Sequence, residues 1–69
     1  MTIRQMLNRM DIDGEIRVQY RDENTDDFIV IFEDDCIEDA DDDILDKNVT
    51  CICPDRNKYG FPVIQIYVE

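Results

Sequence analysis

The sequence predicts a single α+β domain in which an amino-terminal helix packs on a four-stranded, mainly antiparallel sheet. Three observations predict it: an early apolar stripe at helical spacing, four later apolar segments that pair into two hairpins, and an acidic loop or short helix between those hairpins. The chain has 69 residues, so residues 1–69 form one small core and leave no room for a deep cleft between two lobes.

The predicted helix begins with a capping box, because Thr2 is followed three residues later by Gln5. Apolar residues then recur at i, i+3, i+4 and i+7, and these are Ile3, Met6, Leu7 and Met10. We expect this stripe to pack on the chain's own sheet, since so short a chain has little other apolar surface. A turn at residues 11–14, which contains Gly14, ends the helix.

The first predicted hairpin joins two strands of different character. Residues 16–20 alternate apolar and polar side chains, which is typical of a strand with one buried face, and the polar run 21–27 forms the loop. The second strand, Phe28 to Glu33, is apolar on both faces. We therefore expect it in the centre of the sheet, covered by the helix on one side and by a partner or a second protomer, as in a homodimer, on the other.

An abrupt change of composition follows, since residues 33–46 contain nine acids in fourteen residues. The apolar residues of this segment lie at partial helical spacing and are Ile37, Ala40, Ile44 and Leu45. They would anchor a short helix or turn and direct the acids to solvent, within a segment that we expect to be irregular and mobile. Such a run is either a solvated face or a specific binding surface.

The second predicted hairpin has strands at 49–53 and 61–68, with a turn at 54–60 that is rich in Asp, Asn and Gly. Pro62 favours an edge position or the start of its strand, because proline cannot donate a ladder hydrogen bond.

Three cysteines, Cys36, Cys51 and Cys53, form an odd set with no secretion signal in the opening residues, which favours free thiols in a reducing cytosol. Cys51 and Cys53 would share one strand face, and Cys36 could complete a three-thiolate site. A tetrahedral zinc site normally takes four ligands, however, and the chain has no histidine. We expect buried structural thiols and no metal site.

The residues needed for common catalytic sites are missing. The chain has no histidine and no serine, and its two glycines, Gly14 and Gly60, cannot build a phosphate-binding loop. We expect no enzyme activity, no catalytic residue and no cofactor. The run from Asp11 to Glu15 resembles part of an EF-hand loop, but its glycine is fourth instead of sixth, so only weak divalent-ion binding along Asp39 to Asp43 is expected.

Charge is the most informative property, because 18 acidic and 7 basic residues give a formal net charge of −11. Direct binding to nucleic acid or to an anionic membrane is disfavoured, since both are negatively charged. The longest apolar run, Phe28 to Phe32, is also too short to span a bilayer. We expect a cytoplasmic protein whose partner presents a basic surface.

Three functions fit these observations. The first is a nucleic-acid mimic that inhibits a nuclease or another nucleic-acid-binding protein, with carboxylates in place of phosphates. The second is an adaptor or accessory subunit that binds through the apolar strand and Tyr20, Tyr59 or Phe61. The third is a metal-ion binder that uses the cysteines or the acids. For the mimic, the candidate partner-binding residues are Glu33, Asp34, Asp35, Glu38, Asp39, Asp41, Asp42 and Asp43.

Small size, strong acidity and an α+β pattern resemble the phage and mobile-element proteins that inhibit host restriction or CRISPR enzymes. The opening run MTIRQMLNRMDIDGEIRV, a capped helix that leads through Asp and Gly into a strand, is also similar to small uncharacterised proteins of phages and integrative elements. The resemblance implies an inhibitor of a basic target. It carries no functional residues to this chain.

The net charge predicts that stability rises with salt. Self-repulsion opposes the compact state and is screened over about 10 Å at 0.1 M ionic strength. Raising NaCl from about 0.02 M to about 0.5 M should therefore raise the melting temperature, as followed by circular dichroism. A melting temperature that falls over this range would mean that attractive ion pairs outweigh the repulsion.

Overall fold

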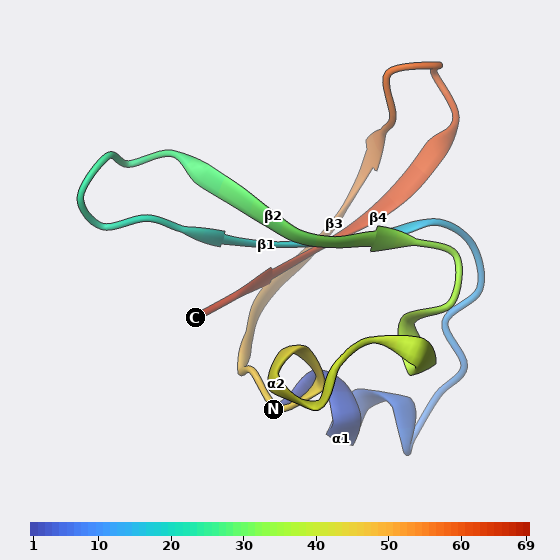
Figure 1. Ribbon diagram of the computed structural model, residues 1–69. Coiled ribbons are helices and arrows are strands. Elements are labelled where there is room, and N and C mark those ends of the chain that lie inside the picture. Colours follow the sequence, from blue (N-terminus) through green and yellow to red (C-terminus); the bar gives the residue numbers. More distant parts are fainter.

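A computed structural model describes all 69 residues and confirms the α+β class (Figure 1). The elements, in chain order, are helix α1 (Ile3–Leu7), strands β1 (Ile16–Arg21) and β2 (Phe28–Asp34), the 3₁₀ turn η1 (Ile37–Asp39), helix α2 (Asp42–Leu45) and strands β3 (Val49–Arg56) and β4 (Pro62–Val68). No helix is long and apolar enough to cross a membrane.

The four strands form one mixed sheet in the order β2-β1-β4-β3. β1 with β2 and β3 with β4 are antiparallel hairpins, whereas β1 and β4 pair in parallel and join the hairpins at the centre. The sheet is twisted, so the two hairpin loops project in different directions, and both helices lie on one side of the sheet (Figure 1). The other side, the open face, has no helix over it.

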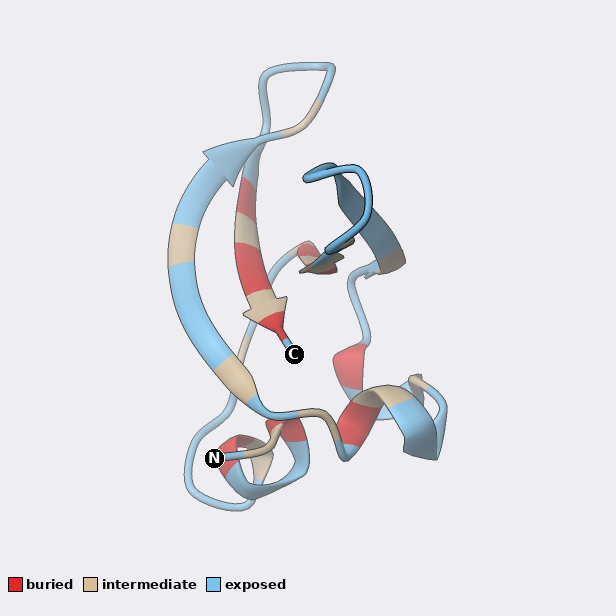
Figure 2. Ribbon diagram, turned by 90° about the vertical axis from the view of Figure 1, so that its left-hand side faces the viewer, coloured by how far each residue is buried: buried red, intermediate tan, exposed pale blue.

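The core lies between the central strands and the helical layer. Buried residues lie on β1, on β4 and in the helical segments. Figure 2 shows the contrast between β4, which is largely buried, and β3, which is mostly exposed. The strands contribute Ile16, Val18, Ile66 and Val68, and the helical layer contributes Ile3, Met6, Ile37 and Leu45.

The capping box of α1 is confirmed, because the Thr2 hydroxyl accepts from the Gln5 amide and the Gln5 side chain accepts from the Thr2 amide. The expected packing on the sheet is also confirmed for Ile3 and Met6, which are buried. The helix is shorter than the stripe, however, and Met10 is 52% exposed. The chain leaves the helix in a turn after Leu7, where the Arg9 amide bonds back to the Met6 carbonyl.

Contacts with residues 47–49 hold the amino terminus in place. Thr2 forms an antiparallel bridge with Asn48, and the Val49 amide donates to the Met1 carbonyl at 2.7 Å. The Ile3 amide donates to the Lys47 carbonyl at 3.3 Å. These bonds bring α1 beside α2 and cover the start of the outer edge of β3.

The expected central position of β2 is wrong, because β2 is an edge strand. β1 takes the inner position instead, with β2 on one side and β4 on the other. The apolar pattern on both faces of β2 has another cause. Phe32 packs against the core on the helical side. On the open face, the ring of Phe28 packs edge-on against that of Tyr67, with 5.1 Å between the ring centroids.

The β3–β4 hairpin departs from the prediction in the length of β3. The strand extends to Arg56, so Pro54 lies inside a strand instead of in the turn. An edge strand tolerates this proline, since its outer backbone groups have no ladder partner. Pro62 is the first residue of β4, at one of the two positions expected for it.

Ile66 and Ile52 form a matched pair for testing the core, since they are register partners on adjacent strands. Ile66 is fully buried and Ile52 is 50% exposed. Ile66→Ala should lower the free energy of unfolding by about 2–5 kcal/mol, because it leaves a cavity. Ile52→Ala should cost well under half as much. Equal losses in urea denaturation would contradict the placement of the core.

Candidate acidic binding surface

The segment that follows β2 is folded onto the core by its apolar residues. Ile37 is fully buried and Leu45 is 6% exposed, while Ala40 and Ile44 are partly buried against the same cluster. This confirms the anchoring that the apolar spacing predicts. The segment consists of two short helical pieces, η1 and α2, so its acids are attached to a folded backbone.

All eight candidate partner-binding residues are exposed. They lie at the end of β2, directly after it, in η1 and around the first turn of α2: Glu33, Asp34, Asp35, Glu38, Asp39, Asp41, Asp42 and Asp43. They follow one another along the chain from the end of β2 to α2, which lies beside α1 in the lower part of Figure 1.

Two of the eight acids pair with arginines of this chain. Glu33 accepts from Arg17 at 2.8 Å, and Asp42 accepts from Arg4 at 2.9 Å. Arg4 also contacts Asp46 at 2.8 Å and so links α1 to α2. The other six candidate acids form no ion pair. We define four of these as the acidic patch: Glu38 and Asp39 on η1, Asp41 at the N-cap of α2, and Asp43 on α2.

Neighbouring carboxylates at the end of β2 affect each other's protonation. The Asp35 amide donates to Asp34 Oδ1 at 2.7 Å, and this bond lowers the pKa of Asp34. The pKa of Asp35 is raised, because its carboxyl group shares a hydrogen bond with Asp34 and meets its negative charge. As pH falls, Asp35 therefore takes up a proton before Asp34.

The loop between β1 and β2 carries a second group of acids, although its polar composition predicts only a hairpin loop. Asp26 has a positive φ of 61° and pairs with Arg21, while the Asp22 side chain accepts from the Asn24 amide at 3.0 Å. Asp27 forms no ion pair. Because the two acidic groups lie at opposite ends of β2, an exposed apolar strand separates them.

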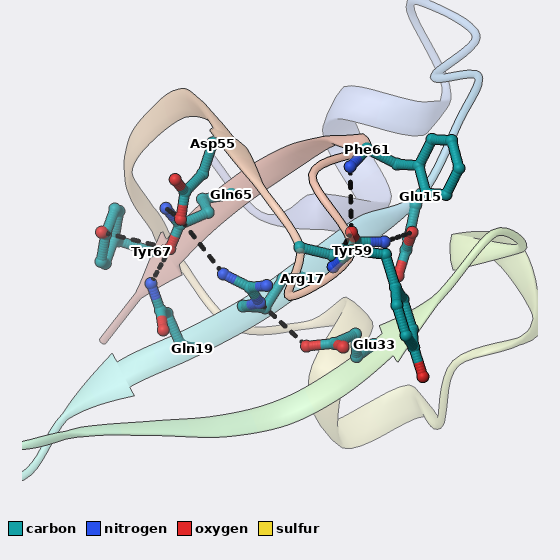
Figure 3. A network of polar contacts seen from close by, with 10 residues as sticks. Glu15, Arg17, Gln19, Glu33, Asp55, Tyr59, Phe61, Gln65 and Tyr67 are labelled. Carbon is teal, nitrogen blue, oxygen red and sulfur yellow. Dashed lines mark hydrogen bonds and ion pairs between the residues drawn. The ribbon is translucent and has the colours of Figure 1, made fainter.

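A hydrogen-bonded network crosses the open face (Figure 3). Arg17 on β1 donates to Glu33 on β2 at 2.8 Å and to Asp55 on β3 at 3.2 Å. The pKa of Arg17 is raised, chiefly by its hydrogen bond to Glu33. Its side chain is only 17% exposed, so this cation is held inside the chain and is little available to a partner.

Two glutamines complete the network and correct the expectation that polar alternation on β1 marks an exposed face. Gln19 and Gln65 are only 7% and 8% exposed. The side-chain amide of Gln19 donates to Gln65 Oε1, and the Tyr67 hydroxyl donates to the same oxygen at 3.3 Å. The side-chain amide of Gln65 donates to the Asp55 carboxylate at 2.7 Å. No buried side-chain polar atom lacks a partner. The buried polar side-chain atoms of the network are therefore all paired within the chain.

The three cysteines are placed differently from the expectation of buried thiols. Cys36 and Cys51 are exposed and Cys53 is partly exposed, so that expectation is wrong. Cys51 and Cys53 do lie on one strand face, because they pair with Tyr67 and Gln65. No three cysteine or carboxylate groups are arranged to hold a metal ion.

The aromatic residues named for an adaptor are also separated. Tyr20 is partly buried and packs against the core, whereas Tyr59 and Phe61 are 73% and 65% exposed in the β3–β4 loop. Asn57 orders this loop, since its side-chain oxygen accepts from the amides of both residues.

Comparison of the chain with protein-family models, with curated proteins and with solved structures finds no match. The resemblance to phage and mobile-element inhibitors is accordingly a proposal about function.

The acids around Cys36 predict slow alkylation of its thiol. Its pKa is raised, first by the charge of Asp35, then by desolvation, and further by the charges of the neighbouring acids. In a Cys51→Ser, Cys53→Ser background, Asp35→Asn should increase the rate of iodoacetamide labelling by about twofold at pH 7.5, because more thiolate is present. Asp11→Asn serves as the control and should change nothing. An unchanged or slower rate in the Asp35 variant would contradict this electrostatic account.

Proposed function

We propose that this protein is a non-enzymatic protein-binding module whose acidic patch binds a basic surface of a partner, in competition with nucleic acid. The observation that carries the proposal is that four unpaired, exposed acids are attached to a segment anchored in the core by Ile37 and Leu45. Charges on an ordered backbone bind with less loss of conformational entropy than charges on a disordered tail. They also steer a basic partner during encounter.

The partner chemistry follows from the net charge of −11. A groove lined with Arg and Lys attracts phosphates, and carboxylates at the surface of a folded domain compete for the same cations. An inhibitor of a nuclease or of another nucleic-acid-binding protein is the form of this function that the charge favours. Its binding should be fast and should weaken with salt.

A matched pair of charge variants tests the proposal. The patch variant is Glu38→Gln, Asp39→Asn, Asp41→Asn and Asp43→Asn, and the control variant is Asp11→Asn, Asp13→Asn, Glu23→Gln and Glu69→Gln. All eight acids are exposed, and none makes an ion pair or a side-chain hydrogen bond. Both variants therefore lose four charges and should remain folded.

The immobilised protein is incubated with bacterial lysate, washed at low and then high salt, and its captured partner is purified for affinity measurements. The patch variant should bind at least about fourfold more weakly, since four surface ion pairs contribute roughly 0.2–1 kcal/mol each. The control variant should bind within about twofold of the parent. Duplex DNA should displace the partner. Equal affinity of both variants, or binding that ignores DNA and salt, would reject the proposal.

A second candidate function, an adaptor or accessory subunit, is favoured by the exposed aromatic rings of Tyr59 and Phe61. Burial of such rings in an interface gives binding that survives high salt. The same capture experiment separates the two functions, because a salt-resistant partner that Tyr59→Ala and Phe61→Ala release would belong to the adaptor.

A further inference from the structure

The outer edge of β2 is an open, apolar strand edge. β2 is the first strand of the order β2-β1-β4-β3, so its outer row of backbone groups has no strand partner. Phe28, Ile29 and Val30 are 54%, 38% and 46% exposed. Unpaired backbone groups beside exposed apolar side chains are the usual template for adding another strand.

The other edge of the sheet is protected, which makes β2 distinctive. β3 contains Pro54, Asp55 and Arg56, and the Met1 carbonyl and Thr2 occupy its beginning. Proline and charged residues are common ways of blocking strand addition. Between Phe28 and Phe32, β2 has no proline, glycine or charge, and its one irregularity is a bulge at Ile31 that limits the flat stretch to Phe28–Val30.

Acidic groups flank this edge at both ends. Asp26 and Asp27 precede β2, and Glu33, Asp34 and Asp35 end or follow it. Asp26 forms an ion pair with Arg21, and Glu33 forms one with Arg17. The acids left without an ion pair are therefore Asp27 at one end and Asp34 and Asp35 at the other.

The acids at both ends of β2 argue against strand addition by a second copy of this chain. In an antiparallel pair of β2 strands, Asp27 of one copy would face the acids 33–35 of the other, and in a parallel pair each acidic group would face itself. Like charges placed opposite each other destabilise a strand pair, and each chain already carries a net charge of −11. Cationic residues at both ends of the incoming strand are the complementary arrangement.

We propose that β2 binds an extended segment of a partner protein by strand addition, and that this segment has apolar or β-branched residues at its centre and Arg or Lys at both ends. The backbone of the segment would pair with the outer edge of Phe28–Val30. Its side chains would lie beside Phe28 and Val30 on the open face, and its cations beside Asp27, Asp34 and Asp35. This surface is separate from the acidic patch, and the inference does not rest on the proposed function.

A defined peptide tests the proposal with the full-length chain. The probe is acetyl-Arg-Arg-Thr-Val-Thr-Val-Thr-Arg-Arg-amide, titrated into ¹⁵N-labelled protein at low salt. Saturable binding with a dissociation constant below about 1 mM should shift the amide signals of residues 28–34 and slow their hydrogen exchange, while residues 49–56 change little. The same peptide with Glu in place of Arg should not bind, and neither should one with alternate N-methylated amides.

Two lysine variants form a matched control, because Val30 and Ile52 are similarly exposed at 46% and 50% on opposite edges. Val30→Lys should weaken peptide binding at least about tenfold, since it adds a positive charge at the centre of the edge and removes apolar contact. Ile52→Lys and the patch variant should bind within about twofold of the parent.

Four outcomes would overturn the inference: no saturable binding, equal loss in the two lysine variants, shifts confined to the acidic patch, or self-association of the free protein through residues 28–34. The patch variant separates this test from that of the proposed function. The patch variant keeps the β2 edge and the acids at both of its ends. It should therefore retain peptide binding even if it no longer binds a partner captured through the acidic patch.

Discussion

The parallel pairing of β1 with β4 is the interaction on which the rest of this structure depends. It joins two hairpins that would otherwise be separate, and it places Ile16 and Val18 beside Ile64 and Ile66. The central strands supply half of the buried cluster, and the helical layer supplies the other half by covering them. Neither hairpin alone presents an apolar surface large enough for stability. The helices pack where they do because this central pair offers the one broad apolar face.

The local features of this fold were predictable, because neighbouring residues determine them. The capping box at Thr2 and Gln5, the two hairpins, and the anchoring of the acidic segment by Ile37 and Leu45 all follow from spacing. The order of the strands was not predictable in the same way. An apolar pattern on both faces of β2 fits either a central strand or an edge strand whose Phe28 contacts Tyr67 across the open face, and only the long-range pairing distinguishes them.

For the candidate site, too, local properties were predictable and long-range contacts were not. Exposure of the eight acids followed from composition, whereas their ion pairs depended on elements far apart in the sequence. Arg4 reaches Asp42 from α1, and Arg17 reaches Glu33 across the hairpin. The sequence of β1 does not predict that Gln19 is buried, since a polar residue in an alternating pattern normally faces water. It is buried because its side-chain amide donates across the central pair to Gln65 Oε1 on β4, the same oxygen that accepts from Tyr67.

The parallel pair also bears on how the chain folds during synthesis. Ile16 pairs with Ile64, and Tyr20 pairs with Val68, so the central ladder joins strands from opposite ends of the sequence. Such non-local pairing requires closure of a long loop before any contact compensates for the entropy lost. On the ribosome, β1 and β2 emerge early and remain without β4 until Val68 has left the exit tunnel. During that interval the apolar residues of β2 are exposed on an unprotected edge, and the acids at both of its ends disfavour pairing with another nascent chain because like charges repel.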